Sequence, residues 1–422
     1  MRVVSLWEEK GRDSYDCLSG DPNLASALLS RLRRRIRVST NQTQVIEEGR
    51  NTFTVRGVAG YVRLNRTTAV EVVPKFLDPA DPSWRDDFLL LSTIATRGAL
   101  DVSSALGFRA TSASIPDAIG AALATSIQRA MRRPMFEYRR DSWYSFQVSG
   151  EIVPDAFHEP NPDGFRQRGL RHFDTTPETE VIRQALGRLQ PEVRSPAVRV
   201  RLRGLAGRIQ PQTSPSGRRP KARLAPRHTR WQPAYDLAKA YLAQGGLSLD
   251  KPVHEGAPGF MLPTAPTWER FLTNLLAQYH GAAQVERGKL LFGESRFLPS
   301  GPTVERFVHP DIVVRPPTSL VLLVDAKYKA SIESERRTIA RPDVYEALAF
   351  AKAYEATTVV LLYPGLAEPD TLPGTVAAFE RFTTAGVTVH GVSMAVAGLA
   401  RHKLSQTANR LAQGLQGIVD AV

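Results

Sequence analysis

Residues 308–329 read VHPDIVVRPPTSLVLLVDAKYK, in which two apolar runs rich in β-branched residues flank the segment PPTS at 316–319. Apolar runs on either side of a turn-forming segment are typical of a β-hairpin. With the turn centred on 317 and 318, antiparallel pairing joins residues whose numbers sum to about 635, so Asp311 and Asp325 lie almost directly opposite each other. Because side chains alternate along a strand, Lys327 shares the face of Asp325.

Two carboxylates that face each other across a strand pair need something to offset their repulsion. Their Cβ atoms would lie about 5 Å apart, where like charges are destabilising. A hard divalent cation such as Mg²⁺ takes oxygen ligands, keeps several waters and accepts a substrate phosphate. At Asp311 and Asp325 it would lower the pKa of a bound water and stabilise charge on a scissile phosphate, while Lys327 orients that water or holds the phosphate. The alternative is a salt-bridge triad on a surface hairpin.

A further acid, Glu269, lies in the segment TWERFLTNLLAQYH at 267–280. Apolar residues recur there at helical spacing and predict a buried stripe, formed by Trp268, Phe271, Leu272, Leu275 and Leu276. Glu269 either joins the metal site or only favours the helix dipole, with Thr267 as the N-cap. Spacing alone leaves both readings open.

Patterns on either side of the hairpin predict an α/β domain with a mixed sheet and flanking helices over residues 250–422. The predicted elements are a helix from Thr267 to Tyr279, strands near 283–293, the strand pair at 307–328, a helix at 342–355 and strands at 357–363 and 386–394.

The first part of the chain, residues 1–235, is expected to form a separate region in which strands precede helices. Residues 52–76 alternate β-branched with polar residues and predict a β-meander. Apolar residues at helical spacing predict helices within 86–133 and 176–208. The segment 213–230 holds three prolines and six Arg or Lys residues, so we expect an exposed basic loop that either contacts DNA phosphates or is a solvated insertion.

The composition favours a soluble protein with a polyanionic partner. The 422 residues, of which 42% are hydrophobic and 23% charged, suffice for two globular domains. Lys and Arg number 55 against 42 Asp and Glu, and this net charge of +13 suits nucleic acid, although solubility alone would also explain it. Cys17 is the only cysteine, which excludes an internal disulfide framework and fits the cytoplasm. No apolar run reaches the roughly 18 residues of a membrane span, so we expect a protein that is neither exported nor membrane-spanning.

The candidate site resembles the PD-(D/E)xK nuclease superfamily, with Glu269 upstream of Pro310-Asp311 and Asp325-Ala326-Lys327. The wider chain is similar to the McrC family, the nuclease subunit of McrBC-type 5-methylcytosine restriction systems. Separate segments carry this similarity: GYVRLNRTTAVEVVPKF at 60–76, YRRDSWYSFQVSGEIVP at 138–154, HFDTTPETEVIRQAL at 172–186, DAKYK at 325–329 and DVYEALAFAKAY at 343–354. Two positions depart from the family pattern, Glu151 for an arginine and Glu346 for a glutamine, and we assign Glu346 no role in the site.

The resemblance implies the Mg²⁺-dependent endonuclease subunit of a modification-dependent restriction complex, acting on double-stranded DNA. For residues 250–422 it implies a restriction-endonuclease-like fold, with Asp311, Asp325 and Glu269 as metal ligands and Lys327 as a further catalytic residue. For residues 1–235 it implies engagement of an McrB-like AAA+ NTPase hexamer. The chain has no GxxxxGK[ST] phosphate-binding loop, so GTP or ATP is expected to bind the partner.

Two other functions remain open from the sequence. Instead of an endonuclease subunit, the chain could be a non-enzymatic assembly factor that stimulates the NTPase, or a stand-alone DNA repair nuclease. The intact Asp311, Asp325 and Lys327 argue against the first, and the large N-terminal region argues against the second. The sequence does not identify which modified base is recognised, because the resemblance assigns this recognition to the partner.

Overall fold

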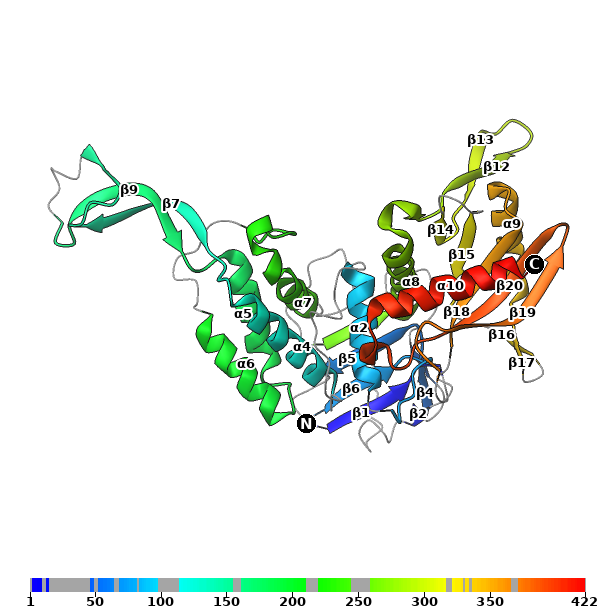
Figure 1. Ribbon diagram of the computed structural model, residues 1–422, viewed down its shortest axis with the longest axis horizontal. Coiled ribbons are helices and arrows are strands. Elements are labelled where there is room, and N and C mark those ends of the chain that lie inside the picture. Colours follow the sequence, from blue (N-terminus) through cyan, green and yellow to red (C-terminus); the bar gives the residue numbers. More distant parts are fainter. Residues whose placement is uncertain are drawn as a thin grey trace. The chain divides into compact units, whose positions relative to one another are not determined.

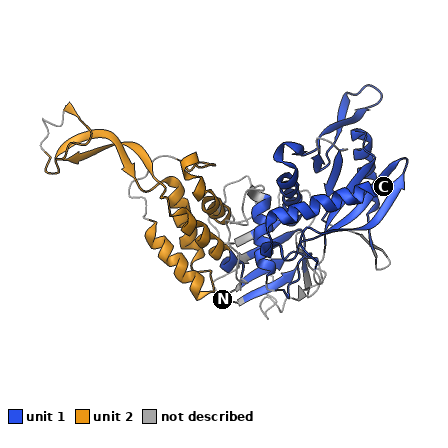
Figure 2. Ribbon diagram, viewed as in Figure 1, with its two compact units in different colours: residues 1–118, 243–422 blue, residues 119–242 orange. Residues whose placement is uncertain are grey.

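The computed structural model describes residues 2–9, 13–14, 46–48, 52–63, 68–81, 83–97, 114–154, 161–209, 219–243, 259–315, 321–328, 331–333, 336–365 and 371–421. The predicted turn at 316–319 and the first part of the basic loop, 213–218, lie outside the described residues. The chain divides into two compact units, residues 1–118 with 243–422 and residues 119–242 (Figure 2). The boundaries of these units differ from those of the expected regions 1–235 and 250–422. The reason is that strands from residues 1–118 pack with residues 243–422 in one unit.

Unit 1 contains a six-stranded sheet in the order β11-β14-β15-β18-β20-β19 (Figure 1). Its strands are β11 (Val285–Glu286), β14 (Ile312–Val314), β15 (Leu322–Ala326), β18 (Thr358–Gly365), β20 (Val387–Ala395) and β19 (Val376–Thr384). β15, β18 and β20 run parallel, and the remaining neighbours are antiparallel. β18 is buried throughout, as expected for a strand covered on both faces. The predicted mixed sheet is confirmed.

Three helices flank this sheet: α8 (Thr264–His280), α9 (Arg341–Tyr354) and α10 (Leu404–Asp420) (Figure 1). α9 buries Phe350 and Ala347 against strand residues such as Leu323 and Leu361. α8 buries the whole predicted apolar stripe. It begins at Thr264 rather than after Thr267, whose hydroxyl donates to the Pro263 carbonyl at 2.6 Å. Thr267 is therefore inside the helix, and the N-cap reading is wrong.

A second sheet of unit 1 joins N-terminal strands to the start of α8. Its order is β1-β6-β5-β10, with β1 (Arg2–Trp7), β6 (Thr68–Val73), β5 (Val58–Arg63) and β10 (Gly259–Pro263). β10 pairs antiparallel with β5 and leads directly into α8. Helix α2 (Trp84–Arg97) packs along α8, and the Asn274 amide donates to the Ile94 carbonyl at 2.8 Å. The N-terminal strands thus support the helix that carries Glu269.

Unit 2 consists of helices and one long β-hairpin. The helices are α4 (Ile115–Ala130, whose first four residues belong to unit 1), α5 (Pro177–Leu189), α6 (Pro196–Arg208), the short η3 (Pro226–Trp231) and α7 (Gln232–Ala243). In the hairpin, β7 (Glu137–Ser145) pairs with β9 (Phe165–Phe173), and β8 (Glu151–Ile152) pairs with β9. The helices predicted within 86–133 and 176–208 are confirmed as α2, α4, α5 and α6, whereas the hairpin was not predicted.

Smaller elements complete unit 1. They are the pair β12 (Leu290–Arg296) and β13 (Thr303–Val308), the pair β16 (Ser331–Glu333) and β17 (Arg336–Thr338), the sheet of β2 (Asp13–Ser14), β4 (Thr52–Val55) and β3 (Ile46–Glu48), and the short helices η4 (Ala282–Gln284) and η5 (Leu399–Arg401). β4 lies in a different sheet from β5 and β6, so the meander predicted over 52–76 is only partly correct. Among the described residues, no helix has the length and apolar character needed to span a bilayer.

Candidate functional site

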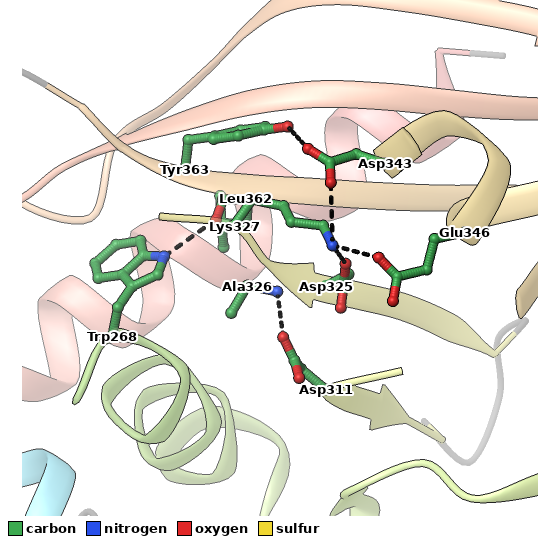
Figure 3. Close-up of polar contacts among 9 residues, drawn as sticks. All are labelled: Trp268, Asp311, Asp325, Ala326, Lys327, Asp343, Glu346, Leu362 and Tyr363. Carbon is green, nitrogen blue, oxygen red and sulfur yellow. Dashed lines mark hydrogen bonds and ion pairs between the residues drawn. The ribbon is translucent and has the colours of Figure 1, made fainter. Parts of the chain in front are cut away.

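Asp311 and Asp325 are brought together by the pairing of β14 with β15. Ile312 lies opposite Val324, and the same register continued by one residue places Asp311 opposite Asp325. The predicted register is therefore confirmed. Asp311 Oδ2 accepts a hydrogen bond from the backbone N–H of Ala326 at 3.0 Å (Figure 3). Asp325 is only 3% exposed, so one of the two facing carboxylates is almost fully withdrawn from water.

Both carboxyl groups have raised pKa values. Burial raises the pKa of Asp325 to about 7, and the charge of Asp311 adds to the effect. Burial also raises the pKa of Asp311, with a further contribution from Glu269. Desolvation and a neighbouring like charge both disfavour the ionised form of a carboxyl group. Ionisation of the two carboxyl groups therefore costs free energy, and a cation between them would offset this cost.

Lys327 lies at the centre of this arrangement. Its backbone N–H donates to the Leu362 carbonyl at 3.1 Å, which extends the pairing of β15 with β18. Its Nζ lies 2.7 Å from Asp325 Oδ2, as expected for side chains on one face of the strand. Burial by itself would lower the pKa of Lys327, but the carboxylates of Asp325 and Glu346 more than offset this and raise it. Lys327 is therefore a fixed positive charge at neutral pH.

Helix α9 contributes two acids that the sequence analysis did not assign to the site. Glu346 Oε2 lies 2.6 Å and Asp343 Oδ1 lies 3.4 Å from Lys327 Nζ (Figure 3). The Tyr363 hydroxyl donates to Asp343 Oδ2 at 3.4 Å, which links this acid to β18. The sequence analysis gave Glu346 no role in the site, and its contact with Lys327 shows that this interpretation is wrong. The signal in the sequence is the spacing of three residues, which places two acids on one helical face.

Glu269 lies at the margin of the site, on α8. Its side chain is 25% exposed, and its Oε1 lies 3.4 Å from a terminal guanidinium nitrogen of Arg287. Its charge contributes to the raised pKa of Asp311, so the two groups are near each other. Within the described ranges, no group of three or more His, Cys, Asp and Glu side chains is arranged to hold a metal ion. The structure therefore brings Asp311, Asp325 and Lys327 together, and Glu269 stands farther from them.

Comparison with known proteins identifies the family. The family model described as "McrBC 5-methylcytosine restriction system component" matches residues 53–364, which is most of the chain. The chain belongs to the McrBC component family. No curated protein shows a significant match to it.

The fold of this McrBC component is also seen in a solved structure. A chain of the refined half-complex from the tetradecameric assembly of Thermococcus gammatolerans McrB AAA+ hexamers with bound McrC aligns with a TM-score of 0.67 and 15% identity, covering 99% of this chain and 100% of that one. A chain of the cryo-EM structure of the Thermococcus gammatolerans McrBC complex aligns with a TM-score of 0.49 and 15% identity, covering 65% of this chain and 87% of that one. At this identity the first likeness describes the fold alone.

Proposed function

We propose that this McrBC component is the Mg²⁺-dependent endonuclease subunit of a modification-dependent restriction complex. The observation that carries the proposal is the register of β14 and β15, which sets Asp311 opposite Asp325 with Lys327 two residues farther along the same face. The order of these residues in the chain, Pro310-Asp311 and then Asp325-Ala326-Lys327, resembles the PD-(D/E)xK pattern.

The donor set fits Mg²⁺ on chemical grounds. Asp311 and Asp325 offer carboxylate oxygens, which are the ligands that hard divalent cations take. Burial raises the pKa of both carboxyl groups, and the charge of Asp311 raises that of Asp325 further, so a divalent cation between them would favour their ionised forms. Two protein carboxylates suit Mg²⁺, because this ion keeps several waters and accepts phosphate oxygens from its substrate. We propose that Glu269, which is now paired with Arg287, would be a further ligand of the metal.

The residues of the chain have distinct roles in hydrolysis of a phosphodiester. Bound Mg²⁺ supplies a water of lowered pKa and a positive charge at the scissile phosphate. Asp311 and Asp325 fix the position of that charge relative to the sheet. Lys327, charged and held by the Leu362 carbonyl through its backbone, orients the attacking water or binds a phosphate oxygen.

We further propose that an AAA+ NTPase ring gates this activity. The structural neighbour described above is a complex of McrB AAA+ hexamers with bound McrC. The present chain has no phosphate-binding loop of the GxxxxGK[ST] type, so a partner has to supply nucleotide hydrolysis. Residues 1–235 are the proposed contact region. Within them, the β7–β9 hairpin exposes Phe146 and Leu170 at 70% and 69%, and exposed apolar side chains of this kind are typical of interaction surfaces.

The experiment combines the purified chain with its AAA+ partner, Mg²⁺, nucleotide and methylated plasmid DNA. We expect double-strand cleavage that needs all components and stops when EDTA removes the metal. Lys327→Ala is expected to abolish cleavage while NTPase stimulation by the chain persists, because the β7–β9 hairpin proposed for partner contact belongs to unit 2, whereas Lys327 belongs to unit 1.

Each alternative function has its own outcome in this experiment. Stimulation of the NTPase by the wild-type chain without any cleavage would establish a non-enzymatic assembly factor. Efficient cleavage by the chain alone, in Mg²⁺ without nucleotide or partner, would establish a stand-alone nuclease. Cleavage that survives Lys327→Ala would refute the assignment of the site.

A further inference from the structure

The residue that follows Lys327 is anchored to the N-terminal sheet. The Tyr328 hydroxyl donates a hydrogen bond to Glu8 Oε2, across 320 positions of sequence. Glu8 Oε1 accepts a second hydrogen bond from the hydroxyl of Thr264, at 2.7 Å. Glu8 is 0% and Tyr328 6% exposed, so this contact is made out of reach of water. A carboxylate on the residue that follows β1 therefore holds the chain where it leaves the site.

Aromatic packing reinforces this anchor. Phe76, which follows β6, lies edge-on to Tyr328 with ring centroids 5.9 Å apart, and lies 6.0 Å from the ring of Trp268. The Trp268 indole N–H donates to the Leu362 carbonyl at 3.1 Å. The same carbonyl accepts the backbone N–H of Lys327, also at 3.1 Å. Phe76 thus packs on Trp268, which shares the Leu362 carbonyl with the backbone N–H of Lys327.

We propose that Glu8 and Tyr328 are positioning residues for Lys327. The N-terminal sheet would then help to hold the nuclease site in its active geometry. The inference rests on the proposed nuclease function. The backbone of Lys327 is held by the Leu362 carbonyl, and the next residue, Tyr328, is held by its hydrogen bond to Glu8. A displacement of about 1 Å at a catalytic group can cost about 100-fold in rate, so a clamp one residue away has a direct effect on hydrolysis.

The electrostatics of Glu8 argue that this contact serves more than packing. Burial raises the pKa of Glu8 to about 7, although Tyr328, Thr264 and Lys75 lower it, while Glu9 raises it further. Lys75 Nζ lies 2.9 Å from Glu9 Oε2 and 4.4 Å from the ring centroid of Tyr328. Burying a carboxyl group costs stability that an apolar side chain of similar size would not. Glu8 is instead held by directional hydrogen bonds from the hydroxyls of Tyr328 and Thr264.

The test measures cleavage kinetics of full-length variants with the AAA+ partner, Mg²⁺ and methylated DNA. We expect Tyr328→Phe and Glu8→Ala each to lower kcat about 10- to 100-fold and to leave the KM for DNA within about 2-fold. Glu8→Gln keeps an oxygen that accepts the tyrosine hydroxyl, so it is expected to retain most of the activity. The double variant is expected to be no worse than Glu8→Ala alone, because Glu8→Ala already breaks the contact that Tyr328→Phe removes.

Asp87→Asn is the matched control for loss of a buried carboxylate. Asp87 is 0% exposed, burial raises its pKa to about 6, and it accepts the backbone N–H groups of Gly398 and Ala400 at 2.7 Å each. It makes these contacts at the start of η5 rather than at Tyr328 or Lys327. We expect Asp87→Asn to lower the thermal midpoint and to leave kcat per folded molecule unchanged.

Hydrogen exchange at the backbone amide of Lys327 gives a readout that needs no catalysis. Faster exchange at Lys327 in Tyr328→Phe and Glu8→Ala, but not in Asp87→Asn, supports the proposal. Wild-type exchange together with wild-type kcat in these two variants overturns it, while loss of cleavage in Lys327→Ala keeps the nuclease function. If the wild-type chain does not cleave in the complete mixture, the nuclease function itself fails, and the positioning role falls with it.

Discussion

Glu346 Oε2 lies 2.6 Å from Lys327 Nζ, as close to this lysine as Asp325 Oδ2 at 2.7 Å. Lys327 is therefore shared between an acid of its own strand and an acid of α9. The Glu346 side chain is 50% exposed, so water and a substrate phosphate reach it, whereas the Asp325 side chain is 5% exposed. A phosphate that binds Lys327 has to compete with Glu346.

Glu346→Gln is predicted to raise the rate of DNA cleavage by about 2- to 5-fold. An ion pair with one exposed partner is worth roughly 0.2–1 kcal/mol, and this is the size of the competition that the change removes. The measurement is the single-turnover rate with saturating partner ring. Glu305→Gln, a change of an exposed acid on β13, is the control and is expected to cleave like the wild type. A fall of more than about 10-fold in Glu346→Gln would show instead that the carboxylate assists hydrolysis.

The register of the site could be predicted because it depends on local sequence. A turn-forming segment, two apolar runs and strict alternation suffice to pair Asp311 with Asp325. The acids of α9 could not be placed in this way, because their contact with Lys327 depends on how a helix packs on the sheet. The contact between Glu8 and Tyr328 spans 320 positions and leaves no periodic signal. The same limit applies to β10, whose partner β5 lies near the start of the chain.

Asp325→Asn is predicted to abolish cleavage and to stabilise the chain in the absence of divalent cations. Asparagine has the same shape but carries no charge to repel Asp311. Since the pKa of Asp325 is raised from 3.8 to about 7, the ionised form costs on the order of 4 kcal/mol at pH 8. Thermal unfolding in EDTA at pH 8 checks the stability, and added Mg²⁺ is expected to stabilise only the wild type. A variant less stable than the wild type in EDTA would contradict the repulsion between the two carboxyl groups.

The stability of the chain is predicted to depend on pH through Glu8. Its pKa lies near 7 in the fold and near its ordinary value of 4.5 in the unfolded chain, so between these values the folded state binds the extra proton. The free energy of unfolding therefore falls as pH rises from about 4.5 to about 7, by up to roughly 3 kcal/mol from this group. Urea denaturation of Glu8→Gln is expected to lack this contribution. Parallel pH profiles for the variant and the wild type would rule the contribution out.

Residues 243–422 are predicted not to fold alone, whereas unit 1 is predicted to fold when residues 119–242 are replaced by a flexible linker. The fragment exposes the edge of β10 that pairs with β5 and the face of α8 that packs on α2. It also leaves Tyr328 without Glu8. The linker variant keeps all these contacts, because both segments of unit 1 are present. Circular dichroism and urea unfolding distinguish the two proteins. A cooperative unfolding transition in the isolated 243–422 fragment would show that the six-stranded sheet folds without the N-terminal strands. This result would remove the structural basis for a positioning role of Glu8.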